Sequence, residues 1–91
     1  MDEHKSHEEL VQEVEEAKKQ LKIGKTYQHY KDPKKLYKIE HFATLEATDE
    51  LVVVYHAEYG PGMYFVRPLT EWLEQVEWHG KTVPRFTPLD Q

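Results

Sequence analysis

The side chains of this 91-residue chain that are best suited to chemistry are its histidines, arginines and tyrosines. Three histidines lie in segments that favour strands, and with Glu58 they would suit a metal-assisted hydrolase if the fold brought them together: His29, His41 and His56. Their spacing matches no metal-ligand motif, and a strand histidine more often makes hydrogen bonds at the rim of a core. We therefore expect no metal site and keep the hydrolase as an alternative.

The two arginines point to a binding site. Arg67 and Arg85 each lie beside a proline in a segment rich in aromatic residues. A guanidinium stacks on aromatic rings and holds a carboxylate or phosphate through two donors. The leading hypothesis is a ligand-binding surface around Arg67, formed with Tyr55, Tyr64, Trp72 and His29. The structural alternative is an ion pair between Arg67 and an acid such as Glu58 or Glu71.

A second candidate surface lies in segment 24–39, where five lysines face one acid, Asp32. Interleaved aromatic and basic side chains are typical of proteins that bind single-stranded nucleic acid. The residues of this alternative are Tyr27, Tyr30, Lys31, Lys34, Lys35 and Tyr37. The net charge of −5 for the whole chain opposes it, because phosphate binding depends on basic residues.

Composition excludes several classes of enzyme. The chain has no Cys, which rules out disulfides, thiolate nucleophiles and Cys-ligated metals. Its single Ser is better explained as a helix cap, and no glycine-rich phosphate loop occurs. We expect no catalytic residues and no cofactor, and therefore a protein that is not an enzyme.

The N-terminal segment has the pattern of an amphipathic helix. Ser6 and Glu9 form a potential capping box, so a helix should begin near residue 7, and Gly24 follows as a C-terminal stop. Its apolar positions recur at helical spacing: Leu10, Val14, Ala17 and Leu21. This stripe either docks on the rest of the chain or pairs with a second copy. The chain divides into a helix over residues 1–23 and a small β-barrel domain over residues 24–91.

After Gly24 the pattern changes to short strands. Alternating or β-branched segments predict strands over 25–30, 36–42, 51–59, 63–67, 75–78 and 81–86, with a loop over 44–50 and a helical turn over 70–73. Because open sheet edges promote aggregation, such a meander favours closure. The predicted fold is mostly β (α+β): a small SH3-like barrel or half-barrel of five to six short antiparallel strands with an N-terminal amphipathic helix.

Six sequence blocks resemble a known bacterial family of unknown function, DUF1653. They are YQHYK at 27–31, LYKI at 36–39, ELVVVY at 50–55, YG at 59–60, VRPL at 66–69 and VPRF at 83–86. The resemblance covers roughly residues 24 to 88. It does not include the N-terminal helix. It implies a small stand-alone or appended domain and carries no established activity.

The chain shows no apolar stretch of the length needed to cross a bilayer and no signal-peptide pattern, so we expect a cytoplasmic protein. The leading functional hypothesis is a binding module for a peptide, a protein partner or a small anionic ligand. Single-stranded nucleic acid is the alternative partner, and no membrane partner is expected. The expected assembly is a monomer or a helix-mediated dimer.

Overall fold

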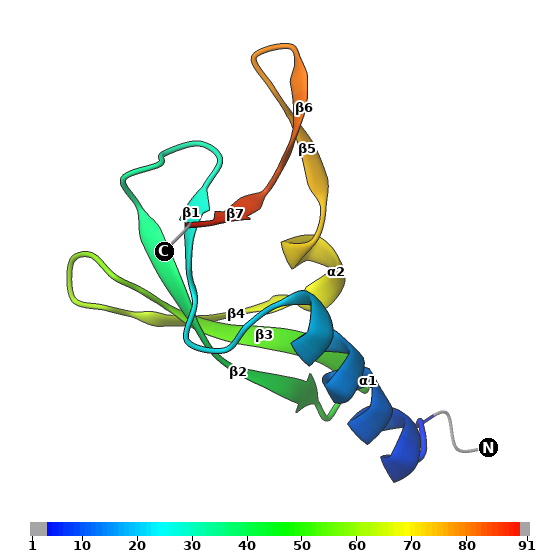
Figure 1. Cartoon of the computed structure of the whole chain (residues 1–91). Helices are drawn as coiled ribbons and strands as arrows, with labels where there is room; N and C mark the ends of the chain where they lie inside the picture. The colour runs from blue at the N-terminus through cyan, green and yellow to red at the C-terminus, as the bar shows by residue number, and fades with distance from the viewer. Residues whose placement is uncertain (1–3, 90–91) are drawn as a thin grey trace.

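The computed structural model describes residues 4–89, which form two helices and seven strands (Figure 1). In chain order these are α1 (His7–Gln20), β1 (Thr26–His29), β2 (Leu36–Leu45), β3 (Glu50–Ala57), β4 (Tyr64–Pro68), α2 (Leu69–Trp72), β5 (Gln75–Trp78), β6 (Lys81–Pro84) and β7 (Phe86–Pro88). The predicted mostly β fold with an N-terminal helix is confirmed. Neither helix within residues 4–89 has the length and apolar character needed to cross a membrane.

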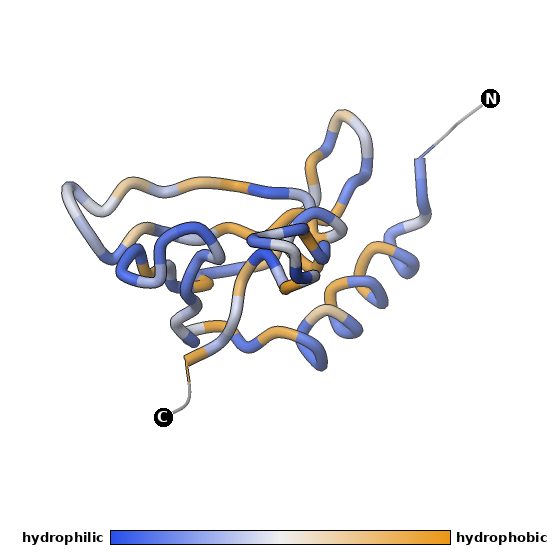
Figure 2. Tube along the Cα trace, turned by 90° about the horizontal axis from the view of Figure 1, so that it is seen from above, coloured by the Kyte–Doolittle hydropathy of each residue, from blue (hydrophilic) through white to orange (hydrophobic). Residues whose placement is uncertain are grey.

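The predicted capping box starts α1. The Ser6 hydroxyl accepts a hydrogen bond from the Glu9 amide at 3.1 Å, and the Ser6 amide donates to the Glu9 carboxylate at 2.9 Å. These two bonds satisfy amides that a helix N-terminus leaves unpaired. The apolar side of α1 turns towards the sheet (Figure 2), and Ala17 and Leu21 are buried there. The helix therefore docks within its own chain.

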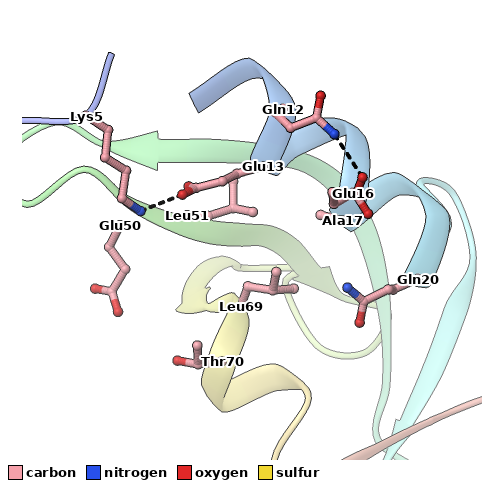
Figure 3. A pocket seen from close by; sticks show the side chains of 10 residues that line it. All are labelled: Lys5, Gln12, Glu13, Glu16, Ala17, Gln20, Glu50, Leu51, Leu69 and Thr70. Carbon is pink, nitrogen blue, oxygen red and sulfur yellow. Dashed lines mark hydrogen bonds and ion pairs between the residues drawn. The ribbon is translucent and has the colours of Figure 1, made fainter. Parts of the chain in front are cut away.

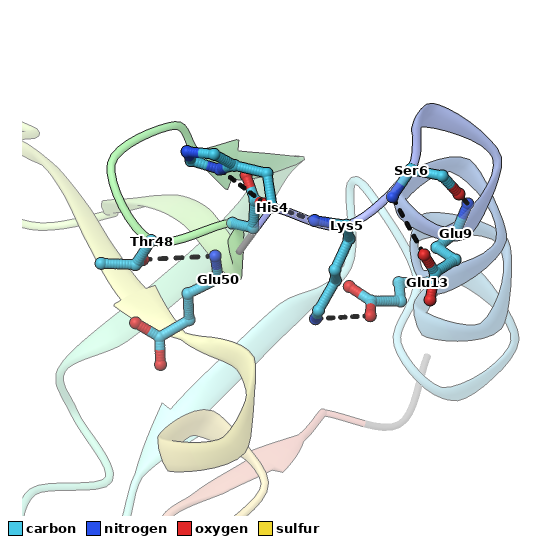
Figure 4. A network of polar contacts seen from close by, with 8 residues as sticks. His4, Lys5, Ser6, Glu9, Glu13, Thr48 and Glu50 are labelled. Carbon is cyan, nitrogen blue, oxygen red and sulfur yellow. Dashed lines mark hydrogen bonds and ion pairs between the residues drawn. The ribbon is translucent and has the colours of Figure 1, made fainter. Parts of the chain in front are cut away.

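Residues before α1 are attached to the turn between β2 and β3 (Figure 4). Asp49 accepts hydrogen bonds from the Lys5 amide at 2.7 Å and from His4 Nδ1 at 2.8 Å. Asp49 has a φ of 61°, a left-handed conformation that Asp tolerates better than most residues. The turn thus presents its carboxylate to the chain entering α1.

The main sheet is antiparallel and open, with strand order β4-β3-β2-β1-β7. Strand β2 pairs with β1 through its first residues and with β3 along most of its length, and a bulge interrupts the register between Ile39 and His41. A bulge bends its strand and increases its twist. The strands do not close into a barrel, so of the two predicted architectures the half-barrel is the one that describes this sheet.

Two predicted boundaries were wrong. The expected loop over 44–50 is shorter because β2 continues to Leu45, and the Asp49 amide closes the turn by donating to the Leu45 carbonyl at 2.7 Å. The expected strand over 81–86 is divided at Arg85. Residues before Arg85 pair with β5 in a separate hairpin, whereas Phe86 begins β7 and pairs with β1. Pro84 favours this break because it cannot donate to a ladder.

The core gathers aromatic rings from the sheet and α2. Its buried cluster consists of Leu21, Tyr27, Ile39, Val53, Tyr55, Trp72 and Phe86. Trp72 contacts Tyr27 and Tyr55 edge to face, with centroids 5.4 and 4.9 Å apart. Such edge contacts add to the stabilisation from burial. The first three residues of β4 lie outside this cluster and are exposed: Tyr64, Phe65 and Val66.

Candidate functional site

Strand register places one arginine and several aromatic side chains on the same face of the sheet. Arg67 lies opposite Val53, Phe65 opposite Tyr55, and His29 opposite Phe86. Because side chains alternate between faces along a strand, positions of equal parity share a face. We call this set the Arg67–aromatic surface. Its partly or fully exposed members are Arg67, His29, Tyr37 and Phe65, and they lie over the buried rings of Tyr55 and Phe86.

The Arg67 guanidinium is only partly used by the protein. Its Cζ lies 5.7 Å from the centroid of the Phe86 ring, a cation–π contact. Its Nη1 donates to the Glu71 carboxylate at 3.3 Å, and Glu71 is exposed, so this ion pair is weak. The buried Nε has no hydrogen-bond partner among residues 4–89. Arg67 therefore keeps donor capacity for a ligand.

Arg85 differs because its guanidinium is occupied. Its Nε donates to the Glu71 carbonyl at 3.1 Å, and its Nη2 donates to the Glu74 carboxylate at 2.6 Å. The Arg85 amide also donates to the Glu74 carbonyl at 3.0 Å. These bonds attach α2 and Glu74 to the residue that precedes β7. Arg85 is thus a structural residue, and Arg67 is the better candidate for binding.

The surface around His29 is electropositive. Burial lowers the pKa of His29 from 6.5, and the nearby positive charges of Arg67, Arg85, Lys31 and Lys35 lower it further. A depressed pKa means that the imidazole is neutral at pH 7, and its Nδ1 accepts a hydrogen bond from the Lys31 amide at 3.2 Å. The positive charges therefore attract an anion to the face that carries Arg67.

Two tyrosines form a hydroxyl pair at the same surface. The Tyr37 and Tyr59 hydroxyl oxygens are 2.6 Å apart, and Lys35 Nζ lies 5.6 Å from the centroid of the Tyr59 ring. Burial raises the pKa of Tyr37, and the hydrogen bond with Tyr59 is the second largest cause of the increase. The Tyr37 phenol consequently stays protonated at neutral pH, and the hydroxyl pair offers a donor and an acceptor at the edge of the aromatic surface.

The structure brings together four of the five predicted ligand-binding residues, in different roles. Arg67, Tyr55 and His29 share the face, but Tyr55 is buried there. Trp72 is also buried and stacks beneath Phe86 with centroids 3.8 Å apart. Trp72 therefore supports the surface without reaching a ligand. The structure does not bring Tyr64 to this face, because strand alternation puts it on the opposite face, where its ring lies 5.3 Å from His56.

Phe86 is a further residue of this site, and the sequence did not indicate it. Its ring contacts His29 at 5.3 Å and Tyr55 at 6.0 Å between centroids, in addition to Arg67. The only sequence signal was its place after Pro84 and Arg85. This position in the sequence does not indicate that β7 pairs with β1. That pairing places Phe86 in the site.

The residues predicted to bind single-stranded nucleic acid are divided between the core and the surface. Tyr27 is buried, so its ring cannot stack on a base. Tyr30 is partly exposed, with Lys31 Nζ 5.8 Å from its ring and the Trp78 ring 5.3 Å away. The remaining residues lie on or beside the hairpin between β1 and β2: Lys34, Lys35 and Tyr37.

The three strand histidines do not converge. His29 lies on the Arg67 face, whereas His41 and His56 lie on the other face of the sheet. His56 Nδ1 is 2.6 Å from a Glu40 oxygen but is not aligned for a hydrogen bond. Within residues 4–89, no group of three or more His, Cys, Asp or Glu side chains is placed to hold a metal ion. The alternative of a histidine-based hydrolase therefore has no assembled site in this part of the chain.

Comparisons with known proteins agree with the resemblance seen in the sequence. A search of curated proteins gave no match. The structure is similar to a crystal structure of a DUF1653 protein from Bordetella bronchiseptica, with 32% identity, a TM-score of 0.66, and coverage of 76% of this chain and 87% of that chain. The profile of the DUF1653 family, described as proteins of unknown function, matches residues 25–88. Because this match spans most of the sequence, the chain belongs to the DUF1653 family.

Proposed function

We propose that this protein is a binding module whose Arg67–aromatic surface holds an anionic group of a peptide, a protein partner or a small ligand. The observation that carries this proposal is the partly used guanidinium of Arg67, which lies against Phe86 with a buried Nε that has no partner among residues 4–89. A buried donor without a partner is costly to a fold, so its retention favours a functional role.

The chemistry of the surface favours an aromatic anion. Arg67 supplies a planar donor group that matches a carboxylate or phosphate. Phe65 is exposed beside it, and the half-buried Tyr37 offers a hydroxyl. A ligand with an anionic group and a ring would therefore use the guanidinium and the aromatic side chains together.

The test is an amide chemical-shift titration with phenyl phosphate as an aromatic anion and benzyl alcohol as its neutral counterpart. We expect phenyl phosphate to shift the amides of Phe65, Arg67 and Phe86, and Arg67→Gln to weaken its affinity about tenfold or more. Arg67→Lys should recover only part of the affinity, because an ammonium lacks the planar arrangement of donors.

Arg85→Gln is the matched control, because it removes the same charge from a guanidinium that the protein already uses. It should lower the melting temperature and leave the phenyl phosphate affinity within about threefold of wild type. If Arg67→Gln lowers stability but leaves phenyl phosphate binding unchanged, Arg67 is a structural residue and the proposal is wrong.

A second candidate function is binding of single-stranded nucleic acid. The observation that favours it is the grouping of Lys31 and Lys35 with both arginines around His29 on one electropositive surface. A short mixed-sequence oligonucleotide should then shift amides between Tyr30 and Lys38, and raising the salt concentration should weaken the binding steeply. No shift at low salt would remove this candidate.

A further inference from the structure

A cavity lies away from the Arg67–aromatic surface. It has a volume of about 360 Å³ and lies between α1, the start of β3 and α2 (Figure 3). Its apolar wall is formed by Ala17, Leu51 and Leu69, one residue from each of these elements. None of its lining residues belongs to the Arg67–aromatic surface. We call this cavity the α1 cleft.

The rim of the α1 cleft is acidic. Three carboxylates line it, those of Glu13, Glu16 and Glu50, against one cationic side chain, that of Lys5. Glu50 has no side-chain hydrogen bond or ion pair within residues 4–89, and Figure 3 shows its carboxylate pointing away from Lys5. The cleft therefore combines an apolar wall with a net negative rim.

One ammonium already sits on this rim. Lys5 Nζ lies 2.6 Å from a Glu13 oxygen, and both side chains remain partly exposed. The hydrogen bond with Glu13 raises the pKa of Lys5, and the charges of Asp49 and Glu9 add to the effect. The position of Lys5 shows where a cation is stabilised, and an exposed pair of this kind is weak enough for another cation to displace.

We propose that the α1 cleft binds an arginine or lysine side chain of a partner protein. An aliphatic stem would lie along Ala17, Leu51 and Leu69, as long basic side chains do when they cover apolar surface. The charged end would then reach Glu50 at the rim. It would compete with Lys5 for Glu13, and for Glu16 it would compete with Gln12 and Lys19, whose side-chain nitrogens lie 2.8 and 3.5 Å from a Glu16 oxygen. The complementarity of charge and polarity identifies this partner, in contrast to the anionic ligand proposed for Arg67.

The test is an amide chemical-shift titration of the full chain with the peptide acetyl-Gly-Arg-Gly-amide, together with its isosteric citrulline analogue, which lacks the charge. The arginine peptide should shift the amides of Ala17, Leu51 and Leu69, and the citrulline peptide should not. The double substitution Glu13→Gln and Glu50→Gln should weaken binding about tenfold, because two partly exposed ionic contacts are lost.

Two further variants separate a local effect from a change in overall charge. Glu8→Gln with Glu15→Gln removes the same charge from exposed positions of α1 outside the cleft, and it should leave the affinity unchanged. Lys5→Met removes the competing ammonium and should strengthen binding about threefold. A purely structural role of Lys5 would not produce this gain.

Several results would overturn the proposal. Equal shifts with the arginine and citrulline peptides would show that charge is not recognised, and an equal loss in the Glu8 and Glu15 control would show only bulk attraction. Tighter binding of free spermidine than of the arginine peptide would assign the cleft to a small polyamine instead of a protein. Melting curves for each variant establish that the fold is intact in these comparisons.

Discussion

The rings of Trp72 and Phe86 stack face to face, with centroids 3.8 Å apart and planes inclined by 11°. Trp72 is the last residue of α2, and Phe86 is the first residue of β7. This contact joins the C-terminal strand to the buried core, and the Phe86 ring also lies beneath the Arg67 guanidinium. The stability of the core and the shape of the candidate site therefore depend on the same pair of rings.

Phe86→Ala should lower the free energy of unfolding by about 3–5 kcal/mol, because it removes a buried ring and leaves a cavity beside Trp72. Urea unfolding followed by tryptophan fluorescence measures this change. Tyr64→Ala is the control, since that ring is 66% exposed on the other face of the sheet. A loss below about 1 kcal/mol for Phe86→Ala would show that the stacking does not hold β7 in place.

Ser6→Ala should destabilise α1 by about 1 kcal/mol, the usual effect of removing a helix cap. The hydrogen bonds with the Ser6 amide and hydroxyl lower the pKa of Glu9 from 4.5, so the substitution should also raise it towards that value. A carboxyl chemical-shift titration of Glu9 in both proteins measures this. An unchanged Glu9 pKa would mean that the Ser6 amide alone accounts for the shift.

His29 should make the protein less stable in mildly acidic solution. Its pKa is below 6.5 in the folded state, so the unfolded chain takes up a proton at a higher pH than the folded chain does. As pH falls from 6.5 towards the folded-state pKa, the free energy of unfolding must therefore decrease. The contribution of His29 to this decrease ends at the pH where His29 is protonated in both the folded and the unfolded state.

His29→Phe removes this titration and keeps a ring beside Phe86. Denaturant unfolding of both proteins at pH 7.5 and at several values below 6.5 gives the comparison. The variant should lose less stability than the wild type over this range. Parallel losses in the two proteins would assign the acid sensitivity to other groups.

Asp49→Gly should release the residues before α1 and leave the turn intact. Glycine adopts a φ of 61° without strain, so the substitution removes the carboxylate without disturbing the backbone. The Lys5 amide then loses its acceptor, and its hydrogen exchange should quicken about tenfold or more. Unchanged exchange at Lys5 with a normal melting temperature would show that Asp49 does not hold this segment.

Local patterns in the sequence were sufficient for the helix and most strands. The Ser6–Glu9 capping box and the helical spacing up to Leu21 identified α1, and alternating or β-branched segments identified most of the strands. These signals are local because hydrogen bonds and side-chain periodicity act over a few residues. The family resemblance was likewise carried by short blocks in order, and it agrees with the matched residues 25–88.

Long-range pairing was decided only by the tertiary structure. The break at Arg85 allows Phe86 to pair with β1. The bulge after Ile39 bends the sheet without closing it. The pairing of β4 with β3 places Tyr64 on the face opposite Arg67. A shift of one residue in register moves every side chain of a strand to the other face. The sequence by itself therefore determined most of the elements, whereas the pairing of distant strands decided which of the candidate side chains meet.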